Sequence, residues 1–245
     1  PTPPSIESGL TTVHVPILMY HYIGQVPPDD PDPQLREGLT VSPQVFGQQM
    51  DWLAANGYHP VTMAQVRGYF QGTNGLPLKP VALTFDDGHA DFYTAAYPIL
   101  QAHQFSATAF IISGFIDDAN GDSMRSWQLI DISHHGIEIG AHTFNHLDLT
   151  TLSPSQLTME LVNPKAKLEQ LTGQSVLDFA YPAGAYNATV IQAVQAAGYQ
   201  SAVTTQPGTS HTWADRFTWT RQRVEGGESM STFIANLGSS DPAAS

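Results

Sequence analysis

Two adjacent carboxylates stand at the end of an apolar run, in the stretch LTFDDGHA that begins at Leu83. An Asp-Asp-Gly turn can simply end a strand and cap the helix that follows. Asp86 and Asp87 could instead divide the work of a catalytic centre, with one carboxylate binding a cation and the other accepting a proton. The residue types alone leave both interpretations open.

A second stretch, GAHTFNHLDL, holds His142 and His146 in a His-x-x-x-His spacing. Neutral imidazole is a common protein ligand of zinc, and this spacing lets two imidazoles point at one position. Either histidine could instead cap a strand or lie on the surface, and the pair alone is weak evidence. Two histidines and one aspartate offer three protein ligands and leave positions open for water and substrate, which is typical of a catalytic metal site.

The elements that must position these residues follow from hydrophobic patterning. Apolar strand-like runs alternate with segments of helical periodicity, which predicts an α/β fold with a parallel sheet covered by helices. The carboxyl ends of parallel strands meet at one edge, so polar residues far apart in sequence are expected to meet there. The expected strands are Val15–Ile23, Val81–Phe85, Ala107–Ile112, Ile137–Thr143, Phe179–Pro182, Tyr199–Thr205 and Phe217–Val224. Helices are expected over 42–56, 91–104, 127–133, 153–171 with Pro164 as a kink or break, 187–197, and from Ser229.

Length and composition narrow the function classes. The chain has 245 residues, of which 41% are hydrophobic, and we expect one domain over 13–238 between a linker, 1–12, and a flexible tail, 239–245. Its net charge of −13 argues against binding to nucleic acid or to an anionic membrane surface. It contains no cysteine and no apolar run of membrane-spanning length. Few lysines and many Thr, Gln and Ser residues favour a secreted or cell-envelope protein.

TFDDG at Thr84–Gly88 and HTFNH at His142–His146 together resemble the polysaccharide deacetylases, the NodB-homology or carbohydrate esterase family four group. YPAG at Tyr181–Gly184 is a further match, and PILMYHYI near the N-terminus is similar to the poly-N-acetylglucosamine deacetylase subgroup. The resemblance extends over 15–237, nearly the whole chain. It implies one catalytic domain with a distorted (β/α) barrel of about seven parallel strands.

The resemblance also implies a division of roles. Asp86 would be the base, and Asp87, His142 and His146 would bind a divalent metal, with Zn²⁺ favoured and Co²⁺ or Ni²⁺ also suited to these ligands. The implied reaction is attack by metal-bound water on N-acetyl groups of an N-acetylglucosamine-containing polysaccharide or oligosaccharide, with release of acetate. A carboxylate left free beside a coordinated one is suited to take the proton of that water.

Two departures from the family pattern need other residues. Many members carry an arginine in the third motif that holds the base, and Ala180 stands at that position. We expect Arg221 to hold Asp86 instead, with Arg223 as the substitute. Many members also carry a C-terminal histidine as general acid, and residues from 224 onward contain none. The resembled subgroup has a histidine in its MYH stretch, which implies His21 as the acid.

The remaining expectations concern the substrate. Tyr181, Pro182, Ala183 and Gly184 are expected to line the cleft, with a backbone N–H after Tyr181-Pro182 donating to the oxyanion. His89 directly follows Asp-Asp-Gly and is expected to contact substrate, although a loop position explains it equally well.

Four further residues have two interpretations each. Asp91 is expected to cap the helix that follows it or to orient a ligand. Trp127, Trp213 and Trp219 could stack on sugar rings, although core packing is the commoner use of tryptophan.

Two other functions remain open. The same metal chemistry would hydrolyse an acetyl ester, as in acetylated xylan. A carbohydrate-binding homologue without catalysis would explain the missing third-motif arginine, but it would not need a complete set of base and metal ligands.

Overall fold

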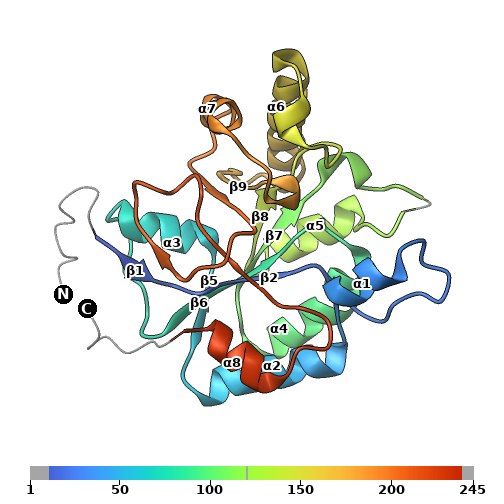
Figure 1. Cartoon of the computed structure of the whole chain (residues 1–245), viewed down its shortest axis with the longest axis vertical. Coiled ribbons are helices and arrows are strands. Elements are labelled where there is room, and N and C mark those ends of the chain that lie inside the picture. Colours follow the sequence, from blue (N-terminus) through green and yellow to red (C-terminus); the bar gives the residue numbers. More distant parts are fainter. Residues whose placement is uncertain (1–10, 120, 239–245) are drawn as a thin grey trace.

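A curled parallel sheet forms the centre of the computed structural model, which describes residues 11–119 and 121–238 (Figure 1). Seven strands follow one path in the order β10-β9-β8-β7-β6-β2-β12, and an eighth, β5, pairs with the first half of β6. The strands are β2 (Ile17–Tyr20), β5 (His59–Val61), β6 (Pro80–Phe85), β7 (Ala107–Ile111), β8 (Ile137–Ala141), β9 (Asp178–Ala180), β10 (Ser201–Val203) and β12 (Gln222–Arg223). The predicted barrel-like parallel sheet of about seven strands is confirmed, and it closes only into a half-barrel. The expected tail, 239–245, and most of the expected linker, 1–12, lie outside the described residues.

Most of the helices cover the outside of this sheet, and short strands flank it. The helices are α1 (Pro33–Leu39), α2 (Pro43–Ala55), α3 (Met63–Phe70), α4 (Tyr97–His103), α5 (Ser126–Ser133), α6 (Pro154–Thr172), α7 (Ala188–Ala196) and α8 (Met230–Asn236). Two small pairs lie outside this sheet. β1 (Val13–His14) pairs antiparallel with β11 (Ser210–His211), and β3 (Tyr22–Ile23) pairs parallel with β4 (Thr40–Val41). Within the described ranges, every helix is too short or too polar to cross a bilayer.

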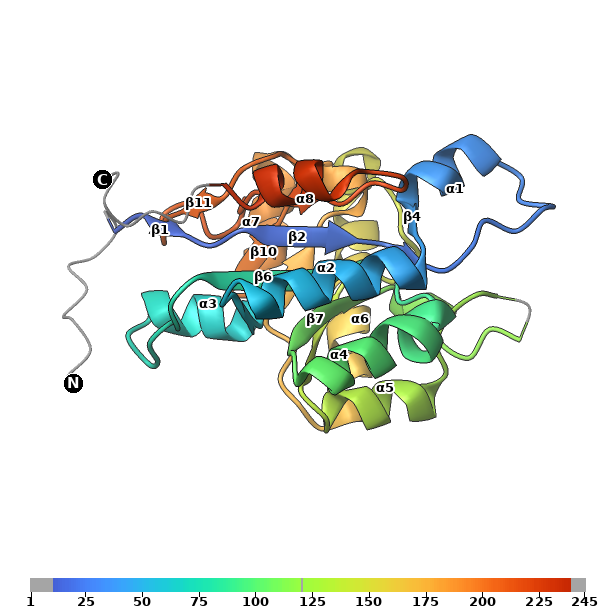
Figure 2. The ribbon, with the colours of Figure 1, turned by 90° about the horizontal axis from the view of Figure 1, so that it is seen from below.

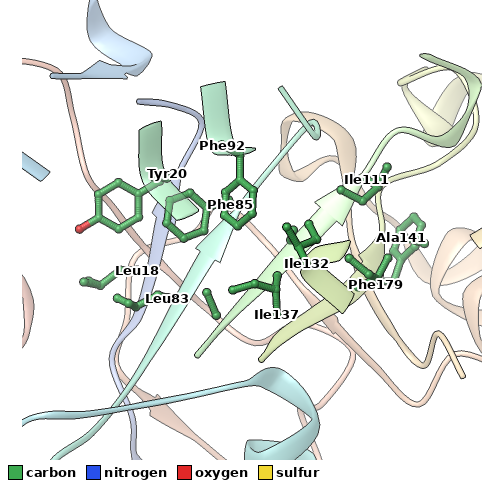
Figure 3. Packing of buried hydrophobic residues seen from close by; sticks show 14 of the residues in the cluster. Leu18, Tyr20, Leu83, Phe85, Phe92, Ile111, Ile132, Ile137, Ala141 and Phe179 are labelled. Carbon is green, nitrogen blue, oxygen red and sulfur yellow. The ribbon is translucent and has the colours of Figure 1, made fainter. Parts of the chain in front are cut away.

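Alternation along each strand divides the buried residues into two sets. In β6, Val81, Leu83 and Phe85 belong to the large cluster between sheet and helices, part of which is drawn in Figure 3. Ala82 belongs to the smaller cluster inside the curl, where α3 also packs. Each fully buried large apolar side chain stabilises the fold by about 1.5–3 kcal/mol, so the two faces fix the register of the strand. The same alternation turns Asp86, the next residue after Phe85, toward the interior.

Local sequence signals explain most helix boundaries. Ser42 caps α2 by accepting a hydrogen bond from the Val45 N–H, and a proline occupies the first helical position. Ser153 and Gln156 form a capping box at the start of α6. The helix runs unbroken through Pro164, so the predicted break there is wrong.

Other expected elements differ from the structure. The helix expected over 91–104 begins as a π-helical turn, Phe92–Ala96, before α4. Pro98 has no N–H to continue a regular α-helical ladder, and the Tyr97 N–H bonds to Phe92 O, five residues back. The strand expected over Phe217–Val224 is also wrong, because only β12 is a strand there. The patterning did not predict β5 and α3, whose short apolar runs are interrupted by proline and polar residues.

Candidate active site

The chemistry-bearing residues gather at the carboxyl ends of the strands. Asp86 follows β6, His142 follows β8 and Pro182 follows β9. In Figure 2, β2 runs from the end where β1 and β11 lie toward the end where α1 lies, so the carboxyl ends face α1. The end near α1, at the right of Figure 2, is called the upper end, and the end near β1 and β11, at its left, is called the lower end.

Asp86 and Arg221 form a bidentate ion pair inside the upper end. The distances are 2.7 Å from Arg221 Nη1 to Asp86 Oδ1 and 2.6 Å from Nη2 to Oδ2. Burial would raise the pKa of Asp86, which is 3% exposed, but the charge and hydrogen bonds of Arg221 hold that pKa below its usual value. Nη1 also donates to Thr84 Oγ1 at 3.1 Å, and Nε donates to Thr204 O at 2.8 Å. Asp86 is therefore an ionised carboxylate, and Arg221 fixes its orientation by hydrogen bonding to both of its oxygens.

The irregular segment before β12 brings Arg221 to this position. Trp219 forms an isolated bridge to Val203 of β10, and three residues later, at Gln222, β12 pairs with β2. The segment therefore crosses from one edge of the curled sheet, at β10, to the other edge, at β2, and Arg221 lies in this crossing segment. Its side chain is fully buried, whereas that of Arg223, in β12, is half-buried. The guanidinium on Asp86 is that of Arg221.

Asp87, His142 and His146 converge on one position beside this pair. Their ligand atoms lie within 4.8 Å of one another. Asp87 Oδ1 lies 3.3 Å from His142 Nε2 and 3.5 Å from His146 Nε2. This oxygen is buried and accepts no hydrogen bond of good geometry, which would be costly without a cation. One carboxylate and two imidazoles are a donor set that divalent zinc prefers, so the residues fit a metal.

Partners behind the three groups fix their orientation. His142 Nδ1 is 2.7 Å from Ala180 O, so this nitrogen carries the proton and Nε2 keeps its lone pair for a ligand. His89 Nε2 is 3.2 Å from Asp87 Oδ2, which leaves Oδ1 directed at the two imidazoles. Asp87 itself has a φ of 72°, in the left-handed region where Asp is among the better tolerated residues. The unusual backbone turns Asp87 away from the interior position that Asp86 occupies.

Comparisons with known proteins agree with this geometry. The family model described as polysaccharide deacetylase matches residues 73–202, more than half of the chain. The chain belongs to the polysaccharide deacetylase family. Members of this hydrolase family act on N-acetyl amide bonds. The predicted family and enzyme class are confirmed.

Individual relatives of this deacetylase span different shares of the chain. A protein named putative polysaccharide deacetylase YxkH from Bacillus subtilis is 33% identical over 223 residues, which is 91% of this chain and 76% of that protein. The Escherichia coli poly-beta-1,6-N-acetyl-D-glucosamine N-deacetylase is 35% identical over 121 residues, 44% of this chain but only 18% of that protein. The structure of Streptococcus pyogenes deacetylase PplD in complex with acetate superposes with a TM-score of 0.84 at 30% identity, covering 94% of this chain and all of that one.

His21 of this deacetylase lies beside the Asp86–Arg221 pair. It follows β2 on an interior position, and its imidazole is half-buried. Burial lowers the pKa of His21 to about 4, although the nearby carboxylates of Asp86 and Asp87 act in the opposite direction. The imidazole is therefore neutral at neutral pH.

The segment Tyr181–Gly184 contributes backbone rather than the tyrosine side chain. Tyr181 is fully buried and donates its hydroxyl to Phe217 O at 3.0 Å, so the prediction that it lines the cleft is wrong. Its ring belongs to the core between sheet and helices. The N–H groups of Gly184 and Ala185 close a tight turn on Tyr181 O and Pro182 O. The two hydrogen bonds of this turn do not use the N–H of Ala183, which is an exposed residue.

His89 is held in a stack rather than left open to the cleft. Its ring lies 3.7 Å from that of Tyr22 in β3, with an interplanar angle of 22°. The guanidinium of Arg36, on α1, lies 3.2 Å from the centroid of the Tyr22 ring. Together with its contact to Asp87, this stack gives His89 a place behind the candidate metal ligands. The sequence signal for His89 was its position after Asp-Asp-Gly, and nothing in the local sequence indicated its partners.

Asp91 and the tryptophans have structural partners. Asp91 does not cap the following helix, and its Oδ2 accepts from the Ile23 N–H of β3 at 3.0 Å, so the capping prediction is wrong. Trp219 is fully buried and packs in the interior cluster. Trp127 is 59% exposed on α5.

Proposed function

We propose that this deacetylase removes N-acetyl groups from an N-acetylglucosamine-containing polysaccharide by metal-dependent hydrolysis, releasing acetate. The observation that carries the proposal is the junction of two sites: a carboxylate clamped by Arg221, and an Asp-His-His group whose atoms converge beside it. In this proposal one catalytic domain spans 13–238. The metal ligands are Asp87, His142 and His146, and Zn²⁺ is the favoured ion.

Asp86 is the proposed base. A divalent cation held by the three ligands would supply positive charge that polarises an acetyl carbonyl and lowers the pKa of the attacking water. Asp86 stays ionised because Arg221 lowers its pKa, and a carboxylate keeps lone pairs beyond the two that Arg221 occupies. Arg221 also prevents Asp86 from rotating toward the cation. In this proposal the neighbouring carboxylates therefore take different roles, one as base and one as metal ligand.

His21 is the proposed acid. The amide nitrogen must gain a proton before it leaves as an amine. The neutral imidazole of His21 has to take up a proton during turnover and can then pass it to this nitrogen. The Ala183 N–H would donate to the oxyanion that forms on the acetyl carbonyl, with Pro182 and Gly184 shaping the turn.

The substrate class is supported by the names of relatives. They include the Escherichia coli protein described above and a Bacillus subtilis peptidoglycan-N-acetylmuramic acid deacetylase, 32% identical over half of this chain. Both names denote polymers of N-acetylated amino sugars. Action on such a polymer places this protein outside the cell or in its envelope in our proposal.

Acetate release separates the proposal from its alternatives. Oligomers of N-acetylglucosamine and acetylated xylan are incubated with the protein after chelation and again after added zinc. We expect zinc-dependent acetate from the amide substrate. Release from xylan alone would replace the amide reaction by the ester reaction, and no release from either would favour a carbohydrate-binding protein without catalysis.

A further inference from the structure

The loop that carries His146 has a backbone that needs support. Thr143 and His146 have φ values of 66° and 58°, in the left-handed region. Thr143 is β-branched, for which this conformation is a true outlier, and such residues persist only where the surroundings over-determine them. The Thr143 hydroxyl accepts from the His146 N–H at 2.9 Å, which closes the loop but does not attach it to the rest of the domain.

Glu160 attaches this loop to α6. This residue of α6 is 3% exposed, and its Oε2 accepts from the backbone N–H groups of Phe144 at 3.0 Å and Asn145 at 2.8 Å. Its Oε1 accepts from Asn145 Nδ2 at 2.8 Å. A buried carboxylate is costly unless several donors satisfy it, and here all three donors come from the two residues before His146. The charge of Glu160 is thus committed to the shape of this loop.

A turn after β7 attaches the loop from the other side, and α6 supports this turn too. Gly114 N–H donates to Phe144 O at 2.8 Å, and a Cβ at this glycine would lie 2.3 Å from the same oxygen. Lys167 of α6 donates to Ser113 O at 2.7 Å. One helix therefore fixes the loop directly through Glu160 and indirectly through Lys167.

The three candidate ligands differ in how they are held. His142 has its Nδ1 on Ala180 O, and Asp87 has its Oδ2 on His89. The side chain of His146 is 37% exposed, and its direction follows from the backbone of the loop. We propose that Glu160 is a positioning residue that places the His146 imidazole in the metal site. This inference rests on the proposed metal-dependent function.

Zinc affinity of the full chain tests the proposal. Zinc is removed with a chelator and titrated back by calorimetry into wild type, Glu160→Ala and Glu160→Gln, with the fold checked by circular dichroism. Removing a group that orients a metal ligand typically costs about 10–100-fold in affinity, and we expect a loss in this range for both variants. Cobalt absorption spectra of the same proteins should show a changed ligand field, which a merely structural role would not produce.

A double variant and a control sharpen the test. In Glu160→Gln with Asn145→Asp, the amide oxygen can still accept the two backbone N–H groups while the amide nitrogen donates to the new carboxylate, so zinc affinity should recover relative to Glu160→Gln. Glu169, also on α6, accepts from Lys165 at 2.7 Å and from the Val176 N–H at 3.0 Å, away from the loop. Glu169→Gln should keep wild-type zinc affinity.

The outcomes separate the two proposals. If wild type binds zinc and folded Glu160 variants bind it equally well with unchanged cobalt spectra, the positioning role is wrong and the proposed function stands. If wild type binds no zinc, the proposed metal site fails and this inference fails with it. An equal loss of affinity in Glu169→Gln would also overturn the inference, because the effect would then belong to the stability of α6.

Discussion

The two ends of the curled sheet each contain a buried aspartate–arginine pair. At the upper end Asp86 is paired with Arg221, and at the lower end Asp178 of β9 is paired with Arg67 of α3 at 3.2 Å. Both aspartates lie on interior strand positions, and α3 covers the lower end, as Figure 2 shows. The same ion pair thus occurs twice in one interior.

The surroundings of the two pairs differ. Asp178 also accepts a hydrogen bond from Ser201, and the Glu138 carboxyl of β8 adjoins it, so the lower pair is surrounded by groups of the protein. The upper group adjoins Asp87, whose Oδ1 is buried without a hydrogen bond. An aspartate–arginine pair by itself indicates only a fixed carboxylate. Its proposed use as a base depends on an unsatisfied neighbour and an open end of the sheet.

Replacement of the two aspartates should give the largest contrast. Asp86→Asn removes the proposed base, and we expect turnover to fall by about 10²–10⁴-fold while zinc stays bound. Asp178→Asn weakens the lower group and should lower the unfolding free energy without such a loss in turnover. Acetate release and zinc content of both purified proteins check this. Loss of zinc from Asp86→Asn, to the extent seen in His142→Ala, would contradict the assigned roles.

The two arginines test the ion pairs themselves. Removing one partner of a buried pair costs about 3–5 kcal/mol, so Arg221→Ala and Arg67→Ala should both unfold at lower denaturant concentration. Only Arg221→Ala should also lower kcat, because only Asp86 is in the proposed site. Lysine variants, which keep the charge, serve where an alanine variant does not fold. Equal kcat values in the two folded variants would remove the functional difference between the ends.

Two histidines offer a matched comparison of the ends. Burial lowers the pKa of both His21 and His211 to about 4, and His211, in β11 at the lower end, contacts Val15 O at 3.0 Å. His21→Ala should lower turnover by about 10²-fold with unchanged zinc content, since it removes the proposed acid. His211→Ala should change stability alone. Unchanged acetate release in His21→Ala would exclude it as the acid.

Stability against pH should differ in sign between the ends. Burial and the Asp178 carboxylate raise the pKa of Glu138 well above its usual value, so its contribution is complete at low pH and is lost as pH rises above about 4.5. For Asp86, whose pKa is lowered, the contribution is present above its unfolded value of 3.8 and is lost as pH falls. Glu138→Gln mimics the protonated group and should raise the unfolding free energy at pH 7.5.

Thermal unfolding at pH 4 and pH 7.5 measures this difference. At pH 4 wild type and Glu138→Gln should be equally stable, because the wild-type side chain is then protonated in both the folded and the unfolded state to a similar degree. A stabilisation of the same size at both pH values would mean that titration of Glu138 is not the cause.

Several features of the fold and site were predictable from local sequence. The strand that precedes Asp86 is a nearly continuous apolar run, and this composition indicates burial on both faces. The His-x-x-x-His spacing and the Asp-Asp-Gly turn are each contained in a few consecutive residues, so both can be recognised in the sequence. In a parallel sheet both motifs stand at the same edge, which predicts that they form one site. The capped helix α2 was predicted for the same reason, since its start signal is contained in Ser42 and Pro43.

Other features depend on residues far apart in the chain. Arg221 reaches Asp86 because an irregular segment crosses from β10 to β2, and periodicity instead predicted a strand there. Tyr181 matches a family motif, yet its side chain packs in the core through a bond to Phe217 O. Glu160 carried no motif signal at all, because its three hydrogen bonds go to a loop about 15 residues earlier.

The sequence by itself determined the family, the parallel α/β architecture and the set of groups available for chemistry, because these follow from short-range patterns and residue types. The tertiary structure decided which arginine meets Asp86, which oxygen of Asp87 stays free, and which of two similar ion pairs adjoins the Asp-His-His group. The two ion pairs join segments more than a hundred residues apart, such as those at positions 86 and 221, and only packing brings such segments together.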